Sequence, residues 1–294
     1  MNATRRALVL GGVSGLLGQS LSGALREANW DVFAASRADF DPTNMDALER
    51  AVDEYKPDFV CNTVAYTAVD KAESEPDQAA ALNKTLPAML GRVCRDKGVG
   101  LIHYSTDFVF DGKKSSPYLE TDQTNPQSVY GKTKLAGERA LLELSPDNLY
   151  ILRTAWIFGP GKSNFVAKIL GLAKERPALN VVHDQRGSPT YTVDLARYTL
   201  ALVEAASPGL YHVVNSGRAS WCELTAEAVA VAGLDCRIEA ITTDQYPLPA
   251  KRPAYSVLDT SKFTAATGVT PRPWVQALRD YVYRDLKMGF EPDN

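Results

Sequence analysis

A glycine-spaced turn near the N-terminus restricts the possible folds of this chain more than any other feature. Gly12, Gly15 and Gly18 follow an apolar run at 7–11 and open a segment whose apolar residues recur at helical spacing. In a strand–turn–helix unit, the first glycine permits a tight turn, the second lets a ligand approach the backbone, and the third allows helix and strand to pack closely. The turn therefore predicts the first half of a βαβ unit.

The first two-thirds of the chain repeats this alternation of strand and helix. The expected strands cover 7–11, 31–36, 59–62, 101–106 and 150–156, with a further strand at 210–214. This rhythm predicts an α/β fold with a Rossmann-type, doubly wound parallel sheet and helices on both faces. The carboxyl ends of the strands should then line one crevice, where ligands bind in such sheets.

The chain changes character after residue 158. A glycine- and proline-rich turn follows, and the later helices and short strands alternate with turns. We expect a dinucleotide-binding domain at 1–158 with a return segment at about 190–218, and a smaller C-terminal α/β substrate domain formed by 159–189 and 219–294. Within that domain we expect a helix from Ser220 to Gly233 and a last helix at 274–286, followed by a disordered tail at 289–294.

Composition excludes several classes of function. The chain has 45% hydrophobic and 23% charged residues, a net charge of -3 and no long run of like charge, which argues against nucleic acid as a partner. Its apolar runs have the length of strands rather than of membrane spans, and a cytoplasmic protein is expected. The four cysteines lack Cys-x-x-Cys pairing and the three histidines lack ligand spacing, so we expect reduced thiols and no metal site.

The glycine turn has the setting of a dinucleotide pyrophosphate site, because backbone N–H groups and the positive end of a helix meet there. The candidate cofactor-binding residues at this turn are Gly12, Ser14, Gly15, Leu16, Leu17 and Gly18. Arg37 and Asp41 after the second strand complete the set. An acidic residue at that strand end favours NAD, whereas Arg37 suits the 2'-phosphate of NADP. NADPH is favoured and NADH stays possible, since Asp39 is also close.

Tyr130 and Lys134 stand four residues apart near the start of an expected helix, so both project from one face. A phenol is a weak acid at neutral pH, and a neighbouring ammonium is expected to lower its pKa. Thr106 ends an expected strand, where its hydroxyl can bond the carbonyl oxygen that Tyr130 protonates. These three residues predict a carbonyl reductase, with Tyr130 and Lys134 also touching the cofactor.

Longer motifs carry a family resemblance. They include Asn62-Thr63-Val64-Ala65-Tyr66-Thr67, Ser105-Thr106-Asp107-Phe108, Tyr130-Gly131-Lys132-Thr133-Lys134, Arg153-Thr154-Ala155-Trp156, Asp184-Gln185-Arg186-Gly187 and Arg252-Pro253. The chain resembles the dTDP-4-dehydrorhamnose reductases, which are extended short-chain dehydrogenases/reductases. The resemblance implies reduction of the C4 ketone of dTDP-4-dehydro-β-L-rhamnose by NAD(P)H, and a nucleotide sugar as the partner. It adds Ala65, Tyr66 and Thr67 to the cofactor site, and it implies a substrate site of Val69, Thr106, Asp107, Phe108, Tyr130, Trp156, Arg186 and Arg252.

Two departures from the family pattern bear on function. Phe108 stands where the family often has Tyr, and where related dehydratases have Glu for acid/base work, which argues against elimination chemistry. Gln19 and Ser20 stand where some members hold a magnesium ion between subunits, so a homodimer is possible but a metal-bridged one is doubtful.

Alternatives stay open at this point. Trp156 could be a core residue rather than a substrate contact. Another nucleotide-sugar reductase or epimerase would share the cofactor motif. The chain could also be a non-catalytic NADP-binding subunit that resembles the regulatory subunit of methionine adenosyltransferase.

Overall fold

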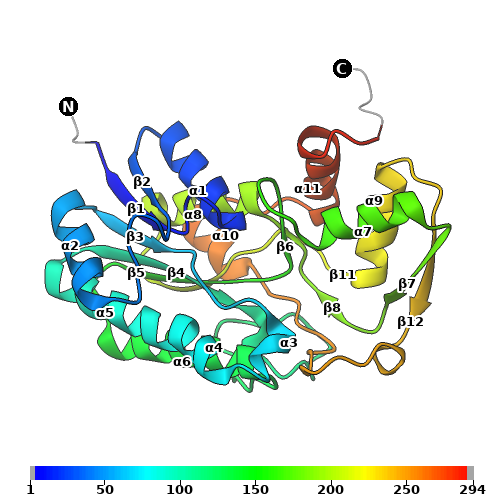
Figure 1. Ribbon diagram of the computed structural model, residues 1–294, viewed down its shortest axis with the longest axis horizontal. Coiled ribbons are helices and arrows are strands. Elements are labelled where there is room, and N and C mark those ends of the chain that lie inside the picture. The colour runs from blue at the N-terminus through cyan, green and yellow to red at the C-terminus, as the bar shows by residue number, and fades with distance from the viewer. Residues whose placement is uncertain (1–3, 290–294) are drawn as a thin grey trace.

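A parallel sheet forms the centre of the larger lobe in the computed structural model, which describes residues 4–289 (Figure 1). Its six strands run in the order β10-β5-β4-β3-β1-β2, and every neighbouring pair is parallel. They are β1 (Arg6–Leu10), β2 (Asp31–Ala35), β3 (Phe59–Asn62), β4 (Gly100–Thr106), β5 (Leu149–Thr154) and β10 (Gly209–His212). The expected α/β fold class is confirmed.

The chain winds in opposite directions from β1, because β2 lies on one side of it and β3 on the other. In open parallel sheets such a switch point leaves a crevice at the carboxyl ends of the two central strands, where ligands bind. The glycine turn after β1 and the loop after β3 both lie at this point.

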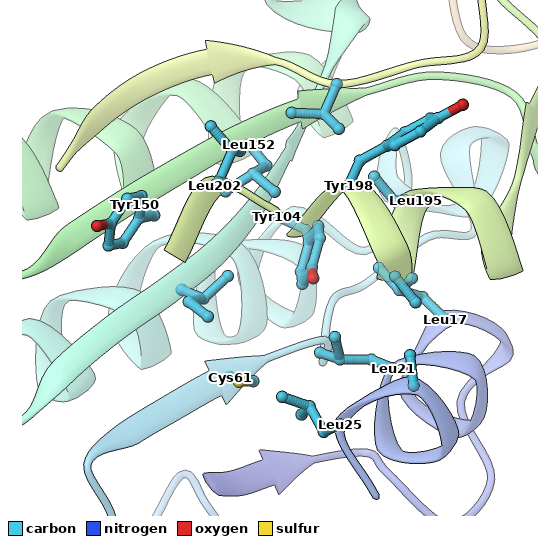
Figure 2. Packing of buried hydrophobic residues seen from close by; sticks show 14 of the residues in the cluster. Leu17, Leu21, Leu25, Cys61, Tyr104, Tyr150, Leu152, Leu195, Tyr198 and Leu202 are labelled. Atoms are coloured by element: carbon cyan, nitrogen blue, oxygen red, sulfur yellow. The ribbon is translucent and has the colours of Figure 1, made fainter. Parts of the chain in front are cut away.

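One face of the sheet is covered by α1 (Leu16–Glu27) and α8 (Thr192–Ala205), with α10 (Ser261–Thr267) packed beside α8. Figure 2 shows Leu17, Leu21 and Leu25 of α1 pointing toward side chains of the strands and of α8. These leucines recur at four-residue spacing, so they form a single stripe on the helix. Their burial fixes α1 over the sheet, and thus the position of the turn that precedes it.

The opposite face is covered by α2 (Met45–Tyr55), α5 (Leu86–Lys97) and α6 (Val129–Leu144). Side chains of β1 belong to the hydrophobic cores on both faces of the sheet: Ala7 and Val9 pack on the α1 side, and Leu8 and Leu10 pack on the side of α2 and α5. This alternation is the two-residue period of a strand that is buried on both sides. Between β3 and α5 the chain forms α3 (Val69–Ala72), α4 (Pro76–Ala80) and a π-helical turn, η1 (Ala81–Thr85).

The smaller lobe has its own core, and it lies on the other side of Figure 1 from the sheet. It holds α7 (Phe165–Glu175), α9 (Trp221–Val231), α11 (Trp274–Asp280) and the π-helical η4 (Tyr281–Asp285). Its strands form three short pairs: β7 (Ala178–Val182) with β12 (Arg237–Ile241), β8 (Arg186–Gly187) with β11 (Ala219–Ser220), and β6 (Ile157–Phe158) with β9 (Thr190–Tyr191). Two 3₁₀ turns, η2 (Asp107–Val109) and η3 (Thr243–Gln245), complete the elements of the described chain.

Local sequence explains where the later helices begin. Ser220 caps α9 by accepting a hydrogen bond from the N–H of Glu223, whose carboxylate accepts from the N–H of Ser220 in return. The expected N-cap is confirmed. The expected last helix is present as α11 and η4, whereas the expected disordered tail lies, apart from Gly289, outside the described residues. The assignment of the two lobes as cofactor and substrate domains stays a prediction.

Candidate active site

The glycines of the turn after β1 allow close contacts within the turn and with β2. The residue with the left-handed backbone is Gly11, at φ +76°, so the expectation that Gly12 makes the tight turn is wrong by one position. A Cβ on Gly12 would lie 2.8 Å from the Cβ of Ala34 on β2. Cβ atoms on Gly15 and Gly18 would lie 2.7 and 2.2 Å from the carbonyl oxygen of Gly11. Each glycine is therefore required for strand, turn and helix to approach one another.

The first turn of α1 suits an anion. Its N-cap, Gly15, supplies no side chain to bond the helix N–H groups, and no acidic residue stands in that turn. Unbonded N–H groups and the helix dipole together attract phosphate. A dinucleotide pyrophosphate fits this position, which is the role expected for Ser14, Leu16 and Leu17.

The residues after β2 bear on the choice between NAD and NADP. Asp39 accepts hydrogen bonds from the N–H and hydroxyl of Ser36, and Asp41 accepts from the N–H and hydroxyl of Thr43. These bonds lower the pKa of both carboxyls, which are tied into local turns. Arg37 is exposed and has no ion-pair partner within the described part of the chain. Its guanidinium is thus free to meet a 2'-phosphate.

Thr106 and Tyr130 come together at the carboxyl end of β4. Thr106 is the last residue of β4 and caps η2 by accepting from the N–H of Phe108 at 3.2 Å. Its hydroxyl donates to Asp107 Oδ1 at 3.1 Å, and the Phe108 ring meets the Tyr130 ring edge-on with centroids 5.5 Å apart. A Cβ on Gly131 would lie 2.3 Å from the Phe108 carbonyl oxygen, so this glycine lets α6 begin against η2.

The electrostatics at Tyr130 run opposite to the expectation. Burial raises the pKa of Tyr130 to about 12; the Thr106 hydroxyl lowers it and the Asp107 carboxylate raises it. Lys134 is buried, and its Nζ donates to the carbonyl oxygen of Tyr104 at 2.6 Å. Burial lowers the pKa of Lys134 to about 8, against the effect of Glu138. The residues of this chain by themselves therefore make Tyr130 a weaker acid than a free phenol.

A buried asparagine, which sequence reasoning missed, joins the 65–67 loop to helix α6. Asn83 lies in the π-helical turn η1, where its Oδ1 accepts from the N–H of Tyr66 at 2.9 Å and its Nδ2 donates to the Tyr66 carbonyl oxygen and to Thr133 Oγ1. A Cβ on Gly137 would lie 2.1 Å from the carbonyl oxygen of Asn83. Asn83 thereby sets the loop that holds Ala65, Tyr66 and Thr67. A π-helical turn disrupts the helical period, and such turns often mark functional sites.

The residues expected to bind substrate differ in their contacts with the rest of the chain. Trp156 is not in a strand: β5 ends at Thr154, and Trp156 has a left-handed backbone at φ +46°. Its ring stacks on Trp221 at 3.5 Å and covers Gly187, where a Cβ would lie 2.4 Å away. These contacts are the ones expected if Trp156 is a packing residue, which is the alternative left open by the sequence.

The two arginines differ as well. Arg186 is exposed on β8, with its backbone bonded to Ala254 and Ser256. Arg252 already has a partner, since its Nη1 and Nη2 donate to the two carboxylate oxygens of Asp70 at 3.0 and 2.8 Å. Asp70 follows Val69 at the start of α3, so this pair brings the 252 segment to the expected substrate side of the sheet.

Comparison with known proteins adds the family. The family model described as the RmlD substrate binding domain matches residues 5–286. The chain belongs to the RmlD substrate-binding-domain family. A dTDP-4-dehydrorhamnose reductase from Streptomyces griseus is 44% identical over 276 residues, covering 92% of this chain and 90% of the relative. A dTDP-4-keto-6-deoxy-D-glucose reductase from Streptomyces niveus is 39% identical, covering 94% and 96%.

A solved structure agrees with this membership. The crystal structure of dTDP-4-dehydrorhamnose reductase from Bacillus anthracis in complex with NADP superimposes with a TM-score of 0.91 at 31% identity, covering 95% of this chain and 98% of that one. The family expected from the motifs is confirmed.

Other features of this RmlD family member lie outside the site. Gln19 donates to the carbonyl oxygen of Gly161 at 3.4 Å, and Ser20 bonds the hydroxyl of Thr192 at 2.8 Å, so both contact their own chain. Within residues 4–289 no group of three or more His, Cys, Asp or Glu side chains is placed to hold a metal ion, and no helix has the length and apolarity to cross a membrane. Two surface cavities of about 520 and 580 Å³ lie on the outer side of α6 and at the amino end of the sheet, away from Tyr130.

Proposed function

We propose that this chain uses NADPH to reduce the C4 ketone of dTDP-4-dehydro-β-L-rhamnose to dTDP-β-L-rhamnose, with Tyr130 as the proton donor. The oxidoreductase class is confirmed by relatives named as reductases, and NADP is bound in the solved relative. The observation that carries the proposal is the position of the Tyr130 ring, which packs edge-on against Phe108 of η2, the turn that Thr106 caps at the end of β4. This is the edge of the sheet that the glycine turn also faces.

The chain's own residues have distinct roles in this reaction. NADPH supplies the hydride to the ketone carbon. The Thr106 hydroxyl donates to Asp107 in the ligand-free chain; with substrate bound it would turn to the ketone oxygen and polarise the carbonyl. Tyr130 gives its phenolic proton to that oxygen as it becomes an alkoxide. An alkoxide is a stronger base than a phenolate, so the transfer is favourable even with the raised pKa of Tyr130. Lys134 lies one helical turn after Tyr130. Its Nζ donates to the carbonyl oxygen of Tyr104, which ties α6 to the carboxyl end of β4.

The glycine turn and the loops around it would hold the cofactor. The first turn of α1 takes the pyrophosphate, Arg37 takes the 2'-phosphate, and the 65–67 loop lies over the adjoining strand end. On the substrate side, Val69, Asp107, Phe108, Trp156, Arg186 and Arg252 remain the proposed contacts. A homodimer likewise stays a prediction.

The test is consumption of NADPH, followed by its absorbance, when dTDP-4-dehydrorhamnose is added to the purified protein. We expect turnover that falls at least a hundredfold in Tyr130→Phe. Tyr150→Phe is the matched control, because that phenol lies at the other end of the sheet and donates to the Ala206 carbonyl oxygen. Intact NADPH binding without turnover in the unmodified protein would favour the non-catalytic alternative.

A second comparison separates neighbouring activities. The Streptomyces niveus relative is named for a keto sugar with a different configuration. Parallel assays with dTDP-4-keto-6-deoxy-D-glucose therefore test which 4-keto sugar is preferred. Greater kcat/KM for that sugar than for the dehydrorhamnose would overturn the proposed substrate while retaining the reductase chemistry.

A further inference from the structure

A chain of three buried polar side chains runs behind the site. Asn62 ends β3, His103 lies on β4 and Lys134 lies in the second turn of α6. Asn62 Nδ2 is 3.1 Å from His103 Nδ1, and His103 Nε2 is 3.5 Å from Lys134 Nζ. All three residues are at most 2% exposed. Neither Asn62 nor His103 has a role in the chemistry described above.

The backbone fixes the orientation of the asparagine amide. Asn62 Oδ1 is 3.1 Å from the backbone nitrogen of Val64, and a backbone N–H can only donate. The oxygen of the amide therefore faces Val64, and the NH₂ group faces His103. Since an amide NH₂ group only donates, His103 Nδ1 must accept with its lone pair.

This orientation decides where the histidine proton lies. Burial, and to a lesser extent Lys134, holds the pKa of His103 well below its usual value, so the ring is neutral. A neutral imidazole that accepts at Nδ1 carries its proton on Nε2. The Nε2–H bond is then directed at Lys134 Nζ.

Two donors face each other when Lys134 is an ammonium, whereas a neutral amine can accept the Nε2–H with its lone pair. We propose that Asn62 and His103 are positioning residues that bias Lys134 toward the neutral amine, by presenting it with a histidine proton. The proposal rests on the proposed function, in which Lys134 assists Tyr130. Its consequence is a lysine that exchanges its proton near neutral pH and does not remain permanently charged.

The other groups around Lys134 leave room for this bias. Glu138, one turn further along α6, favours the ammonium, but Arg153 of β5 and Ser105 of β4 already bond its carboxylate. The Tyr104 carbonyl oxygen, which accepts from Lys134 Nζ at 2.6 Å, also favours the ammonium, so the histidine proton acts against both groups. Tyr130 on α6 is neutral at working pH, because burial and Asp107 of η2 raise its pKa.

The proton placement is tested directly by ¹⁵N NMR of the histidine rings in the folded full-length protein, without substrate. The chain has three histidines, and the His103 signals are those lost in His103→Leu. We expect an unprotonated Nδ1 and a protonated Nε2 for His103 across the range of pH in which the protein is active. A proton on Nδ1, or on both nitrogens, would overturn the proposal.

The effect on Lys134 is tested by the pH dependence of kcat. In His103→Leu no N–H bond is directed at Lys134, so a facing donor no longer disfavours the ammonium. Because the ammonium is the form of Lys134 that is expected to lower the pKa of Tyr130, the loss of activity at high pH should move upward by about one unit. His183→Leu is the control, since His183 follows β7 in the smaller lobe and its backbone N–H donates to the Ile241 carbonyl oxygen of β12. An identical pH profile in His103→Leu and the unmodified protein would contradict the proposal.

A second variant covers the case in which His103→Leu fails to fold. In Asn62→Asp a carboxylate oxygen replaces the NH₂ group and accepts from Nδ1–H, so the histidine proton should move from Nε2 to Nδ1 in the NMR spectrum. An Nε2–H tautomer that persists in Asn62→Asp would overturn the role given to Asn62. Because NMR needs no substrate, an unmodified protein with the expected tautomer but no turnover would reject the proposed function alone.

Discussion

Arg153 and Glu138 form a bidentate ion pair in which both side chains are almost inaccessible, at 5% and 1% exposure. The Nε and Nη2 atoms of Arg153 lie 3.0 and 2.7 Å from the two carboxylate oxygens. The pair joins β5 to α6 one turn after Lys134. It therefore fixes the helix that carries Lys134 to the strand beside β4.

Breaking this pair should destabilise the fold strongly. In Glu138→Gln the Arg153 guanidinium stays buried without a counter-charge, which costs about 3–5 kcal/mol in comparable pairs. Urea unfolding monitored by tryptophan fluorescence measures the change. Glu239→Gln is the control, because its partner Arg237 is 75% exposed and such pairs contribute less than about 1 kcal/mol. Equal losses in the two variants would argue against a structural role for the buried pair.

Helix α1 offers a matched pair of glycines. Gly18→Ala places a Cβ 2.2 Å from the Gly11 carbonyl oxygen, whereas Gly23→Ala meets nothing within 4 Å. We expect Gly18→Ala to weaken NADPH binding at least tenfold and to lower the melting temperature, because backbone must move. Gly23→Ala should stabilise the protein by about 0.5–1 kcal/mol without affecting binding. Titration of NADPH fluorescence and thermal melts test both, and unaltered binding in Gly18→Ala would contradict the assigned role of the turn.

Asp107 should make stability depend on pH. Burial raises its pKa from 3.8 to about 6, although Ser256 and Thr106 donate to its carboxylate. Because the folded pKa exceeds the unfolded one, the folded state binds more protons in this window, and stability falls as pH rises from about 4 to about 6. Asp107→Asn removes this cost, so its stability relative to the unmodified protein should rise by roughly 2 kcal/mol across the window.

Urea unfolding at several pH values between about 4.5 and 7 measures this difference. Asp122→Asn serves as the control, since the hydrogen bond from Lys114 lowers the pKa of Asp122 and the group stays ionised throughout. A stability difference for Asp107→Asn that is as flat as that of the control would show that Asp107 is ionised at an ordinary pKa.

Substitutions of Arg252 and Asp70 test the proposed contact of Arg252 with the substrate. If Arg252 binds the substrate phosphates, Asp70 competes for its guanidinium, and the two substitutions act in opposite directions. Arg252→Lys loses the two-pronged contact and should raise KM about tenfold, while Asp70→Asn should lower KM; neither should change kcat greatly. If the pair only holds the 252 segment in place, both variants will raise KM. Lys251→Gln, next to Arg252 and exposed, controls for a general loss of positive charge.

Much of the larger lobe could be predicted because its signals are local. The apolar run of β1 and the leucine stripe on α1 need no distant partner to be recognised, and both lie where the sequence placed them. The turn was assigned to Gly12 rather than Gly11, since spacing alone does not show which glycine has a positive φ. Trp156 was placed in a strand because its neighbours are apolar. In the structure it has a left-handed backbone and its ring stacks on Trp221, a residue far along the chain.

The sequence by itself determined the fold class and the order in which Thr106, Tyr130 and Lys134 reach one edge of the sheet, because strand and helix periods encode these locally. The family followed from the resemblance of its longer motifs. Only the tertiary structure decided the electrostatics of these three residues. The pKa of Tyr130 depends on burial and on Asp107, and that of Lys134 on burial and on Glu138. Burial is a property of the packed chain, in which β3, β4, β5 and α6 come together. No short pattern contains the Asn62–His103–Lys134 contact, because its members are brought within hydrogen-bond distance only by that packing.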